Sequence, residues 1–185
     1  MGEGNRHSEL ATFGMGCFWC AEALFGRLRG VATVRPGYCG GHVPQPTYQQ
    51  VCTGDTGHVE VVQLEFDPEA ISYEVLLEVF FAMHDPTTPD RQGVDVGPQY
   101  RSAIFTHSAA QHAAATEAVD ALQRGGTFRN PIVTTVEPAG EFYPAEAYHV
   151  DYYAHHRRDM YCRMAIAPKL DRLAERFEAQ LDVRC

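Results

Sequence analysis

Two cysteines that enclose two large aromatic residues are the first sign of chemistry in this chain. Cys17 and Cys20 flank Phe18 and Trp19, where a short apolar run gives way to a helical pattern of apolar residues. Cys17 is therefore expected at a helix N-terminus, where free backbone N–H groups favour an anion and lower a thiol pKa. The pattern predicts a reactive cysteine beside an aromatic wall for a small ligand.

A glutamate on the apolar face of a strand is the second candidate. Residues 58–66 alternate as a strand does, and Glu60 shares a face with Val62, Leu64 and Phe66. A buried carboxylate is costly unless it is paired or protonated, and a neutral carboxylic acid can donate a proton. The same pattern also fits a glutamate at a strand end that reaches solvent.

The elements that must position these residues follow from periodicity, capping residues and glycines. Two stretches read as loops, the glycine-rich residues 36–41 and the long polar residues 85–99. Thr47 and Gln50 form a capping box for a short helix that stops at Gly54. Strands are predicted near residues 10–13, 31–34, 58–66, 100–106 and 132–136, and helices from about 18 to Gly30, over 72–83 and 108–124, and from Pro168 through Leu181.

Composition narrows the function classes. The 185 residues are enough for one domain, predicted to span 1–185, with no linker or repeat dividing it. The 24 acidic against 15 basic residues argue against a general nucleic-acid binder. No apolar run approaches the ~20 residues of a membrane span, and the polar start lacks a signal-peptide pattern, so a cytoplasmic protein without membrane partners is expected. Six cysteines in a reducing compartment favour redox chemistry or metal binding over a static disulfide framework.

The chain resembles the A-type peptide methionine sulfoxide reductases over nearly its whole length. The likeness begins with Gly16-Cys17-Phe18-Trp19-Cys20, a form of that family's active-site signature found in a subgroup with Cys in the last position. Many ordered matches are far more specific than one motif. The further matching stretches are residues 37–41, 46–52, 56–62, 84–87, 91–93, 99–102 and 145–149.

The resemblance implies an α/β fold, α+β in type, with a mixed sheet flanked by helices and a ferredoxin-like core. It also implies reduction of methionine S-sulfoxide, free or in proteins, as a repair activity in oxidative stress. Cys17 would be the nucleophile and Glu60 the acid. Tyr48 and Tyr100 would hydrogen-bond the sulfoxide oxygen, Asp95 would hold the polar side, and Phe18 and Trp19 would hold the substrate methyl group.

Attack on the sulfoxide would leave Cys17 as a sulfenic acid, which condenses with a second thiol to a disulfide. By resemblance, Cys162 is the expected resolving thiol and thioredoxin the reductant, with no bound cofactor. Cys20 and Cys185 stay open as alternatives, while Cys39 and Cys52 are expected to be structural. The chain departs from the family pattern at Cys20, at Val150 and in its charged helical tail.

Two other classes compete with this reading. A zinc-binding module would use Cys17, Cys20, His155 and His156, although a second C-x-x-C and a regular histidine spacing are missing from the sequence. A thioredoxin-like oxidoreductase would use Cys17 and Cys20 alone and would leave Glu60 without a task. Bound zinc would mark the first alternative, and absent sulfoxide turnover the second.

Overall fold

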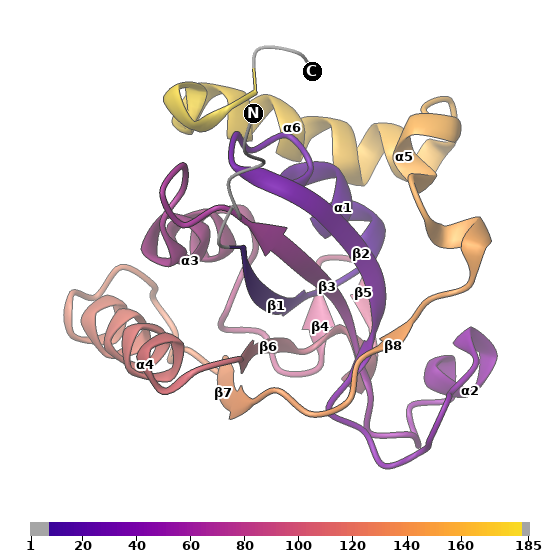
Figure 1. The fold of residues 1–185 in the computed structure, drawn as a ribbon. Coiled ribbons are helices and arrows are strands. Elements are labelled where there is room, and N and C mark those ends of the chain that lie inside the picture. Colours follow the sequence, from indigo (N-terminus) through magenta and orange to yellow (C-terminus); the bar gives the residue numbers. More distant parts are fainter. Residues whose placement is uncertain (1–7, 183–185) are drawn as a thin grey trace, which may run out of the picture.

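The computed structural model describes residues 8–182, which form a six-stranded mixed sheet in the order β7-β6-β1-β3-β2-β8 (Figure 1). A separate two-stranded hairpin lies between α3 and β6 in the chain. The strands are β1 (Glu9–Met15), β2 (Val31–Cys39), β3 (Val59–Phe66), β6 (Ser102–Thr106), β7 (Thr135–Pro138) and β8 (Tyr143–Pro144), and the hairpin is β4 (Arg91–Gln92) with β5 (Asp95–Val96).

The longer helices are α1 (Phe18–Phe25), α3 (Tyr73–Met83), α4 (Ala109–Arg124) and α6 (Ala167–Arg176). Short helical segments complete the described chain: α2 (Tyr48–Cys52), α5 (Tyr152–His155), the 3-10 turns η1 (Pro98–Tyr100), η2 (Ala147–His149) and η4 (Glu178–Gln180), and the π-helical η3 (Cys162–Ile166). None of the helices in residues 8–182 has the length and apolar character needed to span a bilayer.

The four central strands have the order β6-β1-β3-β2, and all three of their pairings are antiparallel. Apart from the short α2, the β4–β5 hairpin and η1, the chain visits them as β1-α1-β2-β3-α3-β6. That succession is the βαββαβ arrangement of ferredoxin-like folds. The predicted mixed sheet with flanking helices is confirmed.

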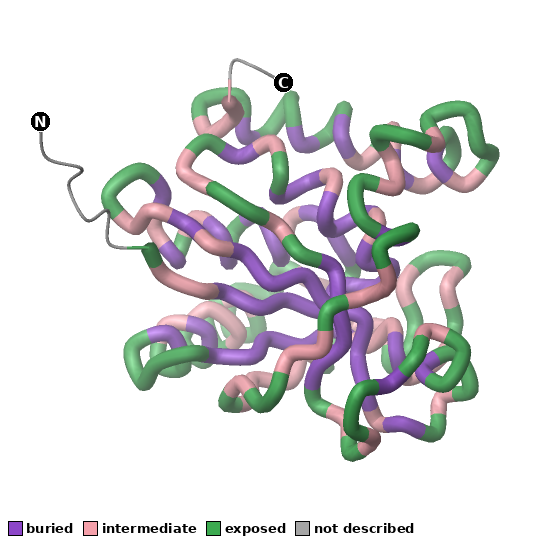
Figure 2. The backbone as a smooth tube through the Cα atoms, turned by 45° about the vertical axis from the view of Figure 1, so that its right-hand side comes forward, coloured by how far each residue is buried: buried purple, intermediate pink, exposed green. Residues whose placement is uncertain are grey.

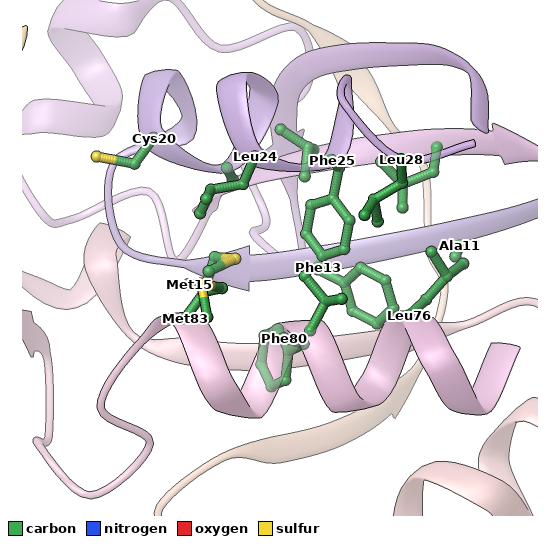
Figure 3. Close-up of a cluster of buried hydrophobic side chains, with 14 of the residues drawn as sticks. Ala11, Phe13, Met15, Cys20, Leu24, Phe25, Leu28, Leu76, Phe80 and Met83 are labelled. Carbon is green, nitrogen blue, oxygen red and sulfur yellow. The ribbon is translucent and has the colours of Figure 1, made fainter. Parts of the chain in front are cut away.

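The main core lies where β1 faces α1 and α3 (Figure 3). Alternate residues of β1, Ala11, Phe13 and Met15, are buried there. The Phe13 ring lies 5.4 Å from the Phe25 ring of α1 and 5.3 Å from the Phe80 ring of α3. Loss of such a buried ring costs about 3–5 kcal/mol, so β1 and both helices form one packed unit.

Strand β3 is buried on both faces, as the continuous purple run of central strands in Figure 2 illustrates. Val62, Leu64 and Phe66 belong to the main core. Val59 and Val61 belong to a smaller cluster on the other face, together with Cys39, Ala103 and Phe105. Glu60 therefore lies on the main-core side, as its alternation predicted.

The predicted loop at residues 36–41 is wrong in its first half, because β2 continues to Cys39. Pro36 cannot donate a hydrogen bond, but its carbonyl accepts one from Ala145 N at 2.9 Å. Gly37 is needed in this strand, since a Cβ there would come within 2.5 Å of the Phe142 ring and the Tyr143 carbonyl. Backbone pairing outweighs the turn propensity of the Pro-Gly pair.

Two helix ends also differ from prediction, for one shared reason. Helix α1 stops at Phe25, with Gly26 rather than Gly30 as its C-cap, and α6 stops at Arg176. Leu28 and Leu181, read as helix-face residues, instead pair with each other in an isolated antiparallel bridge. A contact between distant segments buries them without extending either helix.

The long polar stretch 85–99 contains the β4–β5 hairpin and most of η1, so it is more regular than a loop. Two predicted strands also begin late. Tyr100 lies in η1 and β6 starts at Ser102, while β7 starts at Thr135. The short helix is confirmed, because Thr47 and Gln50 make both hydrogen bonds of the capping box.

Candidate active site

Cys17 lies at the turn between β1 and α1. Gly16 makes this turn with φ +91°, and a Cβ there would come within 2.6 Å of Gln92. Cys17 is the N-cap of α1, and its carbonyl accepts a hydrogen bond from Cys20 N at 3.1 Å. Its side chain is 8 % exposed, which leaves a narrow approach to the sulfur.

The predicted lowering of the Cys17 pKa is wrong. Burial raises the pKa of Cys17 well above its ordinary value, and a hydrogen bond to Cys20 and the charge of Glu60 raise it further. The N-terminus of the eight-residue helix α1 carries a partial positive charge that would lower the thiol pKa. This effect is smaller than the rise in pKa caused by removing the sulfur from water. Burial therefore favours the neutral thiol at this position.

Glu60 is almost completely buried beside this thiol. Its Oε2 accepts a hydrogen bond at 3.1 Å from Phe18 N, the first N–H of α1. Burial raises the pKa of Glu60 to about 8, although the hydrogen bond from Phe18 N lowers it. The charges of Asp95 and Cys20 add to the rise. The carboxyl group is thus mostly protonated at pH 7 and can donate a proton next to Cys17.

Tyr48 and Tyr100 reach the same place from α2 and η1. Burial raises the pKa of both phenols, and the negative charge of Glu60 raises both further. The charge of Cys17 also raises the pKa of Tyr100, and a hydrogen bond with Cys52 raises the pKa of Tyr48. Both hydroxyl groups stay neutral and can donate hydrogen bonds near Glu60.

Phe18 and Trp19 form the predicted aromatic wall. Phe18 is completely buried, with its ring centroid 5.9 Å from that of Tyr38 and 6.4 Å from that of Tyr48. The Trp19 indole stacks on Tyr152 at 3.7 Å between centroids, so one of its two faces is already covered. Its N–H donates to His149 Nδ1 at 3.1 Å, which fixes the ring orientation.

Asp95 belongs to a second polar group, beside Cys20. The Tyr161 hydroxyl donates to Asp95 Oδ2 at 2.9 Å, and the Tyr161 hydroxyl oxygen lies 3.7 Å from Cys20 Sγ. The charge of Asp95 also reaches Glu60 and Tyr100, raising the pKa of each. The structure therefore brings Asp95 to the site through Tyr161.

Three residues with clear tasks were missed by the sequence interpretation. Glu146 joins two site segments, because its carboxylate accepts from the Tyr38 hydroxyl and from Tyr48 N, both at 2.8 Å. His149 orients Trp19, and Tyr161 contacts Cys20. Glu146 and His149 lie in the matched stretch 145–149, and Tyr161 directly precedes Cys162, so the motifs held a signal that residue type alone did not.

The five described cysteines are all free thiols. Cys39 is buried in the small second core as expected, but Cys52 is exposed at the end of α2, so its prediction as a packed core thiol is wrong. Cys20 and Cys162 are both buried, whereas Cys185 lies outside the described residues. Within residues 8–182, no group of three or more His, Cys, Asp or Glu side chains is arranged to hold a metal, so the zinc-module alternative gains no support.

Comparison with known proteins agrees with this geometry. Residues 9–181 match the family model described as peptide methionine sulfoxide reductase. The chain is 54% identical over 173 residues to the Thermus thermophilus peptide methionine sulfoxide reductase MsrA, covering 94% of this chain and 97% of that protein.

Two solved structures share the fold. Methionine sulfoxide reductase A of Corynebacterium diphtheriae superposes with a TM-score of 0.77 at 36% identity, over 83% of this chain and 77% of that one. Mxr1 from Saccharomyces cerevisiae, in complex with Trx2, matches with a TM-score of 0.55 at 25% identity, over 82% of this chain and 89% of that one. The chain, with its buried Cys17–Glu60 pair, belongs to the peptide methionine sulfoxide reductase family.

Proposed function

We propose that this reductase acts on methionine S-sulfoxide, free or in proteins, with Cys17 as nucleophile and Glu60 as acid. The observation that carries the proposal is the carboxyl group of Glu60, buried beside the Cys17 thiol and hydrogen-bonded to Phe18 N at the start of α1; burial raises its pKa to about 8. Reduction of a sulfoxide requires a nucleophile at sulfur and a proton for oxygen. These two groups supply both.

In the first step, the Cys17 sulfur attacks the sulfoxide sulfur while Glu60 gives its proton to the sulfoxide oxygen. Attack forms a bond between the two sulfurs. The protonated oxygen then passes to the Cys17 sulfur while the S–O and S–S bonds to methionine break, so methionine leaves and Cys17 becomes a sulfenic acid. The thiol proton of Cys17 restores the Glu60 acid, so protons balance and the two electrons come from Cys17. A buried thiol and a neutral acid keep the pocket uncharged before the substrate enters.

The proposal assigns substrate binding to the other residues of the site. Tyr48 and Tyr100 donate hydrogen bonds to the sulfoxide oxygen as negative charge develops there, and one such donor is worth on the order of 10²–10³ in rate. Phe18 and the uncovered face of Trp19 contact the methyl group. Asp95 helps to hold the polar side of the site through its hydrogen bond with the Tyr161 hydroxyl.

The second half of the cycle converts the sulfenic acid to a disulfide that an external dithiol reduces. The family resemblance proposes Cys162 for this step, with Cys20 and Cys185 as alternatives. Thioredoxin is the proposed reductant, and the yeast relative's complex with Trx2 supports it. The cytoplasm is the proposed compartment, because the proposed cycle needs a pool of reduced dithiol such as thioredoxin.

A first-turnover experiment tests the carrying observation. Reduced Glu60→Gln enzyme, mixed with one equivalent of methionine S-sulfoxide, should form methionine roughly 10²–10⁴-fold more slowly than wild type, the usual worth of a general acid. Glu117→Gln, a change at an exposed position of α4, is the matched control and should keep the wild-type rate. An unchanged first-turnover rate in Glu60→Gln would remove Glu60 from the mechanism.

A further inference from the structure

Cys17 and Cys20 are direct neighbours in this protein. Cys17 is the N-cap of α1 and Cys20 is its third residue, so both sulfurs lie on one side of the first turn. Each thiol shifts the pKa of the other, and Cys20 N donates a hydrogen bond to the Cys17 carbonyl at 3.1 Å. Side chains three apart on a helix have Cβ atoms about 5–6 Å apart, and a disulfide needs about 3.5–4.5 Å. A small adjustment of the first turn closes that gap.

A chain of polar contacts continues beyond Cys20. The single hydroxyl hydrogen of Tyr161 is used on Asp95, so its oxygen is the acceptor for the Cys20 thiol at 3.7 Å. Lys169 of α6 supplies a positive charge near Cys20. Asp95, Tyr161 and Lys169 also line one hollow of about 360 Å³ against this side of the site. Cys20 thus has Tyr161 and Lys169 as polar partners, and it shares the charge of Asp95 with Glu60.

Cys162 offers a different geometry. Its side chain is completely buried, and it forms part of the main core at the start of η3. Its pKa is raised, by burial first, and the nearby charge of Cys20 adds to the rise. Cys20 is buried in the same core, but it already lies beside Cys17 in the first turn of α1, whereas Cys162 would have to be brought to Cys17 from a separate element.

We propose that Cys20 is the thiol that resolves the Cys17 sulfenic acid, and that Tyr161 and Lys169 are the residues that position and activate it. The inference rests on the proposed function, because it needs the sulfenic acid as its substrate. Cys20 loses its thiol proton and bonds to the Cys17 sulfur. The S–O bond of the sulfenic acid breaks, and the oxygen leaves with its own hydrogen and that proton as water.

The electrostatics of Cys20 suit this attack. In the reduced protein, the interaction with Cys17 lowers the pKa of Cys20 to about 7 against the opposing effect of burial. Positive Lys169 also lowers it, and that charge remains when Cys17 is a sulfenic acid. A thiol with a pKa near ambient pH is the best attacking group in such exchanges. The titratable groups that face it are Cys17 on α1, Glu60 on β3, Asp95 on β5, Tyr161, Cys162 on η3 and Lys169 on α6.

Disulfide mapping gives the direct test. Reduced wild-type protein is mixed with one equivalent of methionine sulfoxide, quenched with acid and digested. We expect Cys17–Cys20 as the dominant link, and a dominant Cys17–Cys162 link overturns the proposal. Methionine released in the same sample reports the first step, so a failure of the proposed function is seen separately, as no methionine at all.

Variants test the same step kinetically. Cys20→Ser should release one methionine per enzyme, retain a sulfenic acid that dimedone labels, and lose turnover with thioredoxin. Cys39→Ser, which changes a thiol in the second core, is the matched control and should recycle normally. Recycling that survives in Cys20→Ser but is lost in Cys162→Ser would return the role to Cys162.

Two further variants separate positioning from folding. Tyr161→Phe keeps the ring against Trp19 but removes the contact to Cys20, so the sulfenic acid should persist longer, on the order of tenfold. Lys169→Gln should move the pH profile of disulfide formation to higher pH, because removal of a positive charge raises the Cys20 pKa. Arg172→Gln, in the same helix and hollow, is the control. An unmoved profile in Lys169→Gln contradicts its role.

Discussion

Trp19 and Tyr152 stack with their ring centroids 3.7 Å apart and their planes within 7°. A residue of α1 holds the Tyr152 segment in place, because Glu22 Oε1 accepts a hydrogen bond from Asp151 N at 3.0 Å. Asp151 has a left-handed backbone, with φ 53°, and directs the chain into α5. One buried glutamate of α1 thus holds the segment that covers its neighbour Trp19.

Removal of the covering ring should weaken substrate binding. Tyr152→Ala removes the stacked ring but keeps the hydrogen bond of the Trp19 indole to His149 and its edge contact with Tyr161, so KM should rise more than kcat falls. Loss of an aromatic pair costs about 0.5–1.5 kcal/mol in addition to the loss of buried apolar surface. Tyr153→Ala, at the next and half-buried position, is the control. Equal effects of the two variants on KM would argue against the stack.

The emission of Trp19 should report events at the site. It is the only tryptophan in the chain, and its indole lies between Tyr152, Tyr161 and His149. We expect its emission to change when substrate binds and when Cys17 is oxidised. Steady-state fluorescence with substrate, compared with the same titration of Cys17→Ser, separates binding from oxidation. A signal that responds to neither would place the substrate elsewhere.

Cys17→Ser should abolish methionine formation, because a serine hydroxyl is a far weaker nucleophile than a cysteine sulfur at neutral pH. Substitution of one buried atom should leave the fold intact, which circular dichroism and a thermal scan can check. Cys39→Ser, at a buried position outside the site, again serves as the control. Measurable first-turnover methionine from Cys17→Ser would overturn the assigned nucleophile.

Glu22 should make stability depend on pH. Burial raises its pKa to about 7 from an ordinary value of 4.5. The folded protein therefore holds a proton that the unfolded chain releases, and stability falls as pH rises from about 4.5 to 7. The fall is at most about 1.4 kcal/mol per pH unit for one such group. Urea unfolding of Glu22→Gln should show a flatter profile across this window, and an unchanged slope would contradict the assignment.

Gly16 offers a test of how Cys17 is placed. Gly16→Ala meets a positive φ and a Cβ clash with Gln92 at 2.6 Å, so stability and activity should both fall. Gly93→Ala has a similar positive φ but open space around its Cβ, and should show only the backbone cost of about 1 kcal/mol. Comparable losses in the two variants would mean that the contact with Gln92 is unimportant.

Local patterns in the sequence predicted the parts of this fold that depend on neighbouring residues. The capping box at Thr47, the stop at Gly54 and the face of Glu60 all follow from short-range spacing, and all are observed. Patterns could not predict pairings between distant segments. The bridge between Leu28 and Leu181 is one example, since it replaces the predicted helix extensions.

The site shows the same division. Residue type and family motifs predicted Cys17, Glu60, Phe18 and Trp19 as site residues, but not the energetic balance around them. The direction of the Cys17 pKa depends on how completely the fold buries the sulfur, which a helix-start pattern does not reveal. The partners of Cys20 come from β5, Tyr161 and α6, which only the three-dimensional fold brings together.

The extension of β2 through Pro36 has a consequence for self-association. Within the described chain, β8 covers the outer side of β2 only at Gly37 and Tyr38, so residues 31–35 form an open sheet edge. Such edges invite strands from other molecules. Here a register shift between Val31 and Thr33 distorts the start of the ladder that an incoming strand would need. Pro36, which has no N–H and whose carbonyl is hydrogen-bonded to Ala145 N, ends this open edge, so the proline that disguised the strand in the sequence limits the length available for intermolecular pairing.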